Sequence, residues 1–162
     1  MTNVQTNRRT LLATGGAALV LGASGLIRPA AAQALKPTPT MRGGANNYQP
    51  GAPVVKRIGK GGFLMTGTVH RASDGAPLEG RRIQIWAHTV EGQEREPQSH
   101  GATLTNKDGY FELDMPQIVP TFGQPHGHLA YDDGEYQSVF LRPVMNSRRD
   151  TTLHADFVLV PA

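Results

Sequence analysis

The sequence predicts an all-β fold, a sandwich or a barrel, and three observations support this. Short runs rich in β-branched and aromatic residues recur along the chain after residue 57. Clusters of Gly, Pro, Asp and Asn separate these runs. No ten-residue segment in the same region shows the period of an α-helix. Several short strands at regular spacing, joined by such turns, are typical of a β-sandwich or a barrel.

The expected strands can be placed in order. Residues 63–71 read as a strand that ends in a turn cluster, and residues 81–88 alternate between apolar and polar side chains, as a strand with two different faces does. A polar loop follows, and then residues 102–115 form a hairpin around the turn NKDG. Residues 116–125 contain three prolines and are expected to be irregular. The last strand-like runs are residues 126–132, 136–142 and 152–160.

Residues 1–34 are expected to be a signal peptide rather than part of the folded domain. Arg8 and Arg9 precede a weakly apolar, Gly- and Ala-rich stretch and a run of small residues, with cleavage expected after Ala32 or Ala34. The arginine pair indicates the twin-arginine route and a periplasmic or extracellular protein. Residues 35–57 are rich in Pro, Gly and Asn and are interpreted as an extended arm or linker, and residues 58–162 as the β-sandwich domain.

Charge and cysteine content exclude several classes of function. Of the 16 Lys and Arg, three (Arg8, Arg9 and Arg28) lie in the leader, so the 13 that remain balance the 13 Asp and Glu. The net charge of +3 is therefore no argument for a nucleic-acid or membrane partner once the leader is removed. The chain has no cysteine, which excludes disulfides and thiolate ligands. Any metal must bind to His, carboxylate, Tyr or backbone oxygen.

The segment PHGH, residues 125–128, carries the strongest indication of a metal site. His126 and His128 are two positions apart in an expected strand, so both imidazoles point to the same face. Two imidazoles on one face can bind one metal ion.

The order of motifs resembles the intradiol ring-cleavage dioxygenases, of the catechol and protocatechuate 3,4-dioxygenase type. The resemblance covers roughly residues 58–160 and rests on five segments: TGTVHRASDGAPLEGRRIQIWAHTVEGQE, HGATLTNKDGYFEL, PHGH, YQSVFL and HADFVLV. It implies a single antiparallel β-sandwich of the intradiol dioxygenase or transthyretin-like type. Transthyretin-like sandwiches share the first half of the pattern without being enzymes. Trp86 and the paired histidines favour the dioxygenases over a purely structural domain.

The resemblance also implies which residues form the site, and where this chain departs from the family. The family binds non-haem Fe(III) through two tyrosines and two histidines. His126 and His128 match the histidines, and Gln137 matches a glutamine that lies near the iron, so we expect Gln137 to act in catalysis. Glu94 stands where the first tyrosine belongs. The loop before the histidines offers only Phe122 in place of the second tyrosine, and the family's arginine in that loop is absent.

The expected metal ligands are therefore His126, His128 and Glu94. Two imidazoles and one carboxylate suit Fe(II), Mn or Zn and leave open positions for substrate or water. His88 and His100 remain alternative third ligands, and three histidines would fit copper or zinc as well as iron. Non-haem iron is the first expectation, with copper, manganese and zinc as alternatives. Glu91 and Glu96 are close enough in sequence to replace Glu94 if the loop alignment slips.

Two functions from different classes follow. The first is an exported, metal-dependent dioxygenase-like enzyme that acts on a small aromatic, catechol-like compound with O₂. The second is a catalytically inactive sandwich that binds a metal, an aromatic ligand or a protein partner, and the missing tyrosines favour it. The extended arm would allow assembly into a homo-oligomer.

Overall fold

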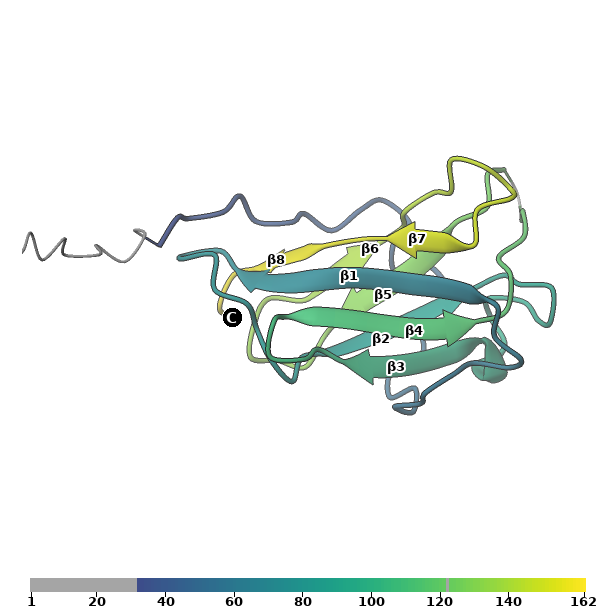
Figure 1. The fold of residues 1–162 in the computed structure, drawn as a ribbon, viewed down its shortest axis with the longest axis horizontal. Coiled ribbons are helices and arrows are strands. Elements are labelled where there is room, and N and C mark those ends of the chain that lie inside the picture. The colour runs from purple at the N-terminus through teal and green to yellow at the C-terminus, as the bar shows by residue number, and fades with distance from the viewer. Residues whose placement is uncertain (1–31, 122) are drawn as a thin grey trace, which may run out of the picture. The chain divides into compact units, whose positions relative to one another are not determined.

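A computed structural model describes residues 32–121 and 123–162, and the regular secondary structure over these residues is almost entirely β-strand (Figure 1). The predicted fold class is confirmed, because two sheets pack face to face as a sandwich. The predicted leader lies almost wholly outside the described residues. No helix in the described part is long and apolar enough to cross a membrane. The strands are β1 (Phe63–Arg71), β2 (Arg82–Ala87), β3 (His100–Leu104), β4 (Tyr110–Met115), β5 (Gly127–Tyr131), β6 (Val139–Leu141), β7 (Thr152–His154) and β8 (Phe157–Leu159), and the one helical turn is η1 (Pro97–Ser99).

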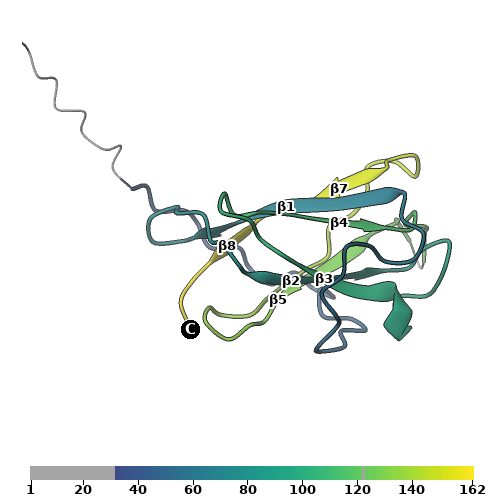
Figure 2. The same cartoon turned by 60° about the horizontal axis from the view of Figure 1, so that its bottom comes forward.

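One sheet has the order β4-β1-β7, with β8 also pairing with β1, and the other has the order β3-β2-β5-β6. Figure 2 shows β1, β4 and β7 in one layer and β2, β3 and β5 in the other. Between the strands named above, the pairings are antiparallel except those of β1 with β7 and β8, which are parallel. The predicted run 152–160 therefore divides into two short strands, which pair with successive parts of β1.

The core lies between the sheets and follows the alternation of the strands. Every second residue of β1 and β4 is buried, which is the pattern of a strand with one face on the core. β2 and β5 differ, because almost all of their residues are buried on both faces. Their second face is therefore covered by another part of the chain.

Residues 40–57, which we call the strap, cover that second face. Backbone hydrogen bonds hold it to the sheet at both ends, from Met41 N to Phe140 O (2.8 Å) on β6 and from Val55 N to Ala102 O (2.9 Å) on β3. Between these points the strap has no strand and is folded into turns. Side chains of the sheet form hydrogen bonds with its backbone carbonyls. Trp86, on the face of β2 away from the core, is fully buried as a result.

A polar cluster on the outer face of the other sheet gives a testable effect of pH on stability. Burial alone would raise the pKa of Asp156, but hydrogen bonds from the Thr68 hydroxyl (2.7 Å) and amide (2.8 Å), together with the pair with His154 (2.9 Å), lower it overall. A carboxyl whose pKa is lower in the folded protein stabilises the fold above its unfolded pKa, about 3.9, and loses this effect as pH falls through the folded value.

We therefore expect Asp156→Asn to lower the melting temperature at pH 7 by up to about 4 °C, since exposed pairs contribute little. The difference from the wild type should begin to shrink as pH falls below about 4 and continue to shrink through the lowered pKa of the folded Asp156 carboxyl. Thermal unfolding followed by circular dichroism at several pH values measures this. An equal difference at pH 3 and pH 7 would contradict it.

Candidate metal centre

The structure brings the three predicted ligands together on the outer face of the sheet β3-β2-β5-β6. His128 lies in β5, and His126 stands just before that strand, where it forms a bridge to Val144. Glu94 comes from the loop between β2 and η1. One ligand atom from each of the three residues lies within 4.8 Å of the other two.

The distances fit a shared ion. Glu94 Oε2 lies 3.2 Å from His128 Nε2 and 3.7 Å from His126 Nε2. Ligand atoms that each bind one transition metal at about 2.0–2.2 Å lie roughly 3–3.5 Å apart. Both distances from Glu94 Oε2 are close to that spacing.

Hydrogen bonds fix the imidazoles with Nε2 free. His126 Nδ1 lies 2.9 Å from Gln124 O, and His128 Nδ1 lies 3.0 Å from Gly44 O. A carbonyl oxygen only accepts, so each Nδ1 must carry a hydrogen, and each Nε2 then presents a lone pair when the ring is neutral. Arg142 also approaches His126 Nδ1, at 3.3 Å, but it cannot donate to a nitrogen that is already protonated. Carbonyl partners of this kind are typical of histidines that bind metals.

Two atoms of the group are buried without a hydrogen-bond partner. These are Glu94 Oε2 and His128 Nε2, among four such side-chain atoms in the described residues. Burial lowers the pKa of His128, and the Gly44 carbonyl and Glu94 offset this only in part. A neutral His128 faces the Glu94 carboxylate with lone pair against lone pair, which is unfavourable in a buried place. A bound cation removes that conflict, so these residues fit a metal ion.

The donor set fits a divalent ion better than the ferric ion of the resembled family. Two histidines and one carboxylate are the ligand set of many non-haem Fe(II) oxygenases, and they also accept Mn or Zn. No tyrosine lies among the three grouped residues. The ring of Tyr48 packs 5.6 Å from that of Trp86 and 5.1 Å from that of Phe140, and its hydroxyl is buried without a hydrogen-bond partner.

The alternative ligands lie outside the group. His100 Nε2 is 2.8 Å from the backbone carbonyl of Glu94, so it donates there and cannot bind a metal through that nitrogen. His88 lines the pocket beside Glu94. Glu91 and Glu96 are engaged elsewhere in the loop region, as acceptors from the backbone amides of Lys60 and Gln93 respectively.

Gln137 is not brought to the group. Its side-chain amide is 3.5 Å from Pro161 O, and it lines a separate hollow formed with residues 37–40, Val158 and Val160. Gln137 is exposed, and it is not among the residues that line the pocket over Glu94. The structure therefore places Gln137, for which a catalytic role was predicted, apart from the metal group.

Trp86 packs against the ligand His128 and against its neighbour His100. Its indole stacks on His128 at 5.1 Å with an angle of 10° between the rings, and on His100 at 5.4 Å with an angle of 8°. Since β2 lies between β3 and β5, the indole is held between the two imidazoles. Trp86 Nε1 donates to Asn46 O in the strap at 2.9 Å.

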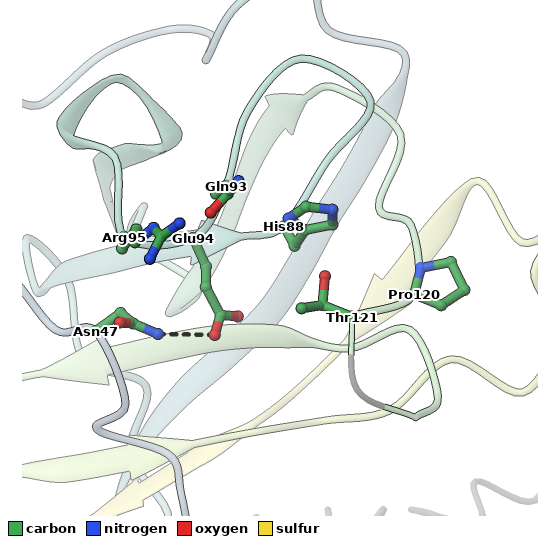
Figure 3. A pocket seen from close by; sticks show the side chains of 7 residues that line it. All are labelled: Asn47, His88, Gln93, Glu94, Arg95, Pro120 and Thr121. Carbon is green, nitrogen blue, oxygen red and sulfur yellow. Dashed lines mark hydrogen bonds between the residues drawn. The ribbon is translucent and has the colours of Figure 1, made fainter.

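A pocket of about 530 Å³ opens over Glu94 (Figure 3). The Thr121 hydroxyl is buried without a hydrogen-bond partner, and polar and charged side chains make up most of the described lining. The pocket offers a polar space next to the metal group. It is lined by Asn47, His88, Gln93, Glu94, Arg95, Pro120 and Thr121.

The strap residues at the site could not be found from the sequence. Gly44 and Asn47 both contact the predicted ligands, through the Gly44 carbonyl and through a hydrogen bond from Asn47 Nδ2 to Glu94 Oε1 at 2.7 Å. The segment GGANNY indicates turns, but nothing in it says what those turns cover.

Comparison with solved structures identifies the class of fold. No family model and no curated protein sequence matches the chain. The structure is similar to hydroxyquinol 1,2-dioxygenase from Pseudomonas putida DLL-E4 (TM-score 0.59, 15% identity, 80% of this chain and 68% of that one). It is also similar to the dioxygenase domain of a dioxygenase carbohydrate-binding protein fusion from Streptomyces sp. SirexAA-E (TM-score 0.61, 16% identity, 78% and 100%). A third match is 3-chlorocatechol 1,2-dioxygenase from Rhodococcus opacus 1CP (TM-score 0.55, 14% identity, 71% and 69%).

The predicted resemblance is thereby confirmed at the level of the fold. The chain has an intradiol dioxygenase-like β-sandwich. At these identities the similarity extends to the fold and no further.

Proposed function

We propose that the chain is a metal-dependent, dioxygenase-like enzyme that acts on a small aromatic diol with O₂. The observation that carries the proposal is the convergence of Glu94 Oε2, His126 Nε2 and His128 Nε2 in a sandwich of dioxygenase type. Two of these atoms, Glu94 Oε2 and His128 Nε2, are buried without a hydrogen-bond partner. Non-haem iron is the first candidate, and copper, manganese and zinc are the alternatives.

When bound, the metal would supply Lewis acidity and open positions for the diol oxygens and O₂. The residues of the chain do the rest. Glu94, His126 and His128 hold the ion, and the Gln124 and Gly44 carbonyls keep both imidazoles in the tautomer that binds it. The Thr121 hydroxyl and the His88 imidazole line the pocket beside the ion, where they can donate to a polar group of the substrate.

The proposed reaction needs no reductant beyond its two substrates. Ring opening between the hydroxyl-bearing carbons of the diol consumes one O₂ per diol and places both oxygen atoms in the product. The test is oxygen uptake with a panel of catechols, in the wild type and in His126→Ala and His128→Ala. Uptake that is lost in both variants supports the enzyme.

Metal binding without uptake across the panel would contradict the enzyme and favour the inactive binding module. The absence of tyrosine from the three grouped ligands among the described residues is the observation that favours this second function.

The colour of the iron-loaded protein provides a further prediction. Tyrosinate bound to Fe(III) gives a strong visible absorption band, and the grouped ligands contain no tyrosine. We expect the iron-loaded protein to lack that band. A burgundy protein whose band disappears in Tyr48→Phe would show that a tyrosine binds the metal after all.

Export through the twin-arginine pathway, predicted from residues 1–34, is part of the proposal. Replacing Arg8 and Arg9 with lysine should keep the protein in the cytoplasm of its host, as measured by cell fractionation. Unchanged export would exclude this route.

A further inference from the structure

Asn47 in the strap is the residue that holds the Glu94 carboxylate in place. Its side-chain amide donates to Glu94 Oε1 at 2.7 Å, and this is the hydrogen bond that the carboxylate accepts among the described residues (Figure 3). The other oxygen, Oε2, is the one that faces His126 and His128. Because the Asn47 amide binds Oε1, it is Oε2 that remains free and points at the two histidines.

The backbone of Asn47 is in a conformation that few residues adopt. Its φ is +56°, and it is the one non-glycine residue in the described part of the chain with a positive φ. Asparagine tolerates this left-handed region better than other non-glycine residues, but it is still unusual. Such conformations are concentrated at functional sites, where the surroundings impose them.

The neighbouring residues of the strap are fixed against the same site. A Cβ on Gly44 would lie 2.6 Å from Phe140 O, so only glycine allows the strap to come this close to β6. The Gly44 carbonyl then accepts from His128 Nδ1 and the Asn46 carbonyl from Trp86 Nε1. Within four residues, the strap contacts the ligand His128, the ligand Glu94 and the indole on which His128 stacks.

The backbone carbonyl of Glu94 is held by His100 Nε2 at 2.8 Å, but its carboxylate has no such anchor except Asn47 among the described residues. Glu94 lies in the loop between β2 and η1 and belongs to no strand. His126 and His128, by contrast, are set by β5 and by their carbonyl partners. The carboxylate is thus the ligand whose position depends most on a side chain from outside its own segment.

We propose that Asn47 is a positioning residue for the metal centre. By holding one oxygen of the Glu94 carboxylate, Asn47 leaves the other oxygen to bind the ion. This inference depends on the proposed function, because it assigns Asn47 a role only if the group binds a metal. Loss of a residue that forms a hydrogen bond with a metal ligand commonly lowers the affinity for the metal by about 10- to 100-fold.

The experiment compares Asn47→Gly with Asn46→Gly in the full chain, with Co²⁺ as the probe. Glycine accepts a φ of +56° without strain, so Asn47→Gly removes the amide and leaves the turn intact. Asn46→Gly adds similar backbone freedom one residue away but keeps both the carbonyl to Trp86 and the Asn47 amide. Affinity is measured by titration of the metal-free protein, and stability by thermal unfolding of the same sample.

The expected result is a loss of about 10-fold or more in Co²⁺ affinity in Asn47→Gly, while the metal-free variant still unfolds in a cooperative transition. Asn46→Gly should bind Co²⁺ as the wild type does. Wild-type affinity in Asn47→Gly would overturn the role of Asn47 while the metal centre stands. Equal losses in the two variants would also overturn it, because they would reflect the turn and not the amide. A wild type that binds no metal ion would overturn both proposals.

Discussion

Replacing Glu94 with glutamine is expected to lower metal affinity by about 100-fold or more, since ligands contribute at least as much as the residues that support them. The change keeps the length of the side chain, and a glutamine oxygen can still accept from Asn47. Its amide nitrogen would then face His128 Nε2, which lies 3.2 Å from Glu94 Oε2 in the wild type. The unfavourable pair of lone pairs becomes a hydrogen bond, so the metal-free variant should be at least as stable as the wild type.

The chain has a built-in reporter for this measurement. Trp86 is its single tryptophan and stacks 5.1 Å from the His128 ring, so a paramagnetic ion at the site should quench its fluorescence. Co²⁺ titrations of the wild type, Glu94→Gln and the control Glu91→Gln give the three affinities. Equal affinity in Glu94→Gln and the wild type would remove Glu94 from the site. An equal loss in Glu91→Gln would assign the effect to the loop as a whole.

Replacing Trp86 with alanine is expected to cost about 3–5 kcal/mol of unfolding free energy, the range for large buried aromatic residues. The indole is fully buried, stacks on His100 and His128, and donates a hydrogen bond to Asn46 O. Its loss would leave a cavity between the strap and the sheet. It would also remove the ring on which His128 stacks. Metal affinity should fall as well, because His128 could then turn away from Glu94.

Urea unfolding of the metal-free protein measures the stability part of this prediction. Trp86→Phe is the matched variant, because it keeps a flat ring between the imidazoles and removes the hydrogen bond to Asn46, which contributes about 1 kcal/mol. A cost below about 1 kcal/mol for Trp86→Ala would mean that the strap collapses onto the sheet without the indole. Since the fluorescent residue is absent, circular dichroism follows both variants.

Much of the fold could be predicted because a strand with one buried face has apolar and polar residues in alternation, and this pattern is visible in the sequence. The expected strand 63–71 coincides with β1, and the expected run 126–132 contains β5. The paired histidines follow from the same rule, since residues two apart in a strand share a face. The parallel pairing of β1 with β7 and β8 was not expected, because partner choice depends on the whole sheet.

The rest of the site depends on contacts between distant parts of the chain. His128 and Gly44 are 84 residues apart in sequence, and Asn47 and Glu94 are 47 apart. The strap has no strand of its own, so no periodicity marks which residues face the sheet. Glu94 could be placed only through the family resemblance, and Gln137, placed in the same way, lies in a different hollow.

The measurement that tests the central claim most directly is the metal content per chain, by elemental analysis, of protein matured in its own host. The wild type is measured beside the double variant His126→Ala/His128→Ala and the control His70→Ala, a histidine of β1 outside the group. The account predicts about one transition metal ion per chain in the wild type and in His70→Ala, and none in the double variant. A wild type without stoichiometric metal, or a double variant that retains it, would contradict the account.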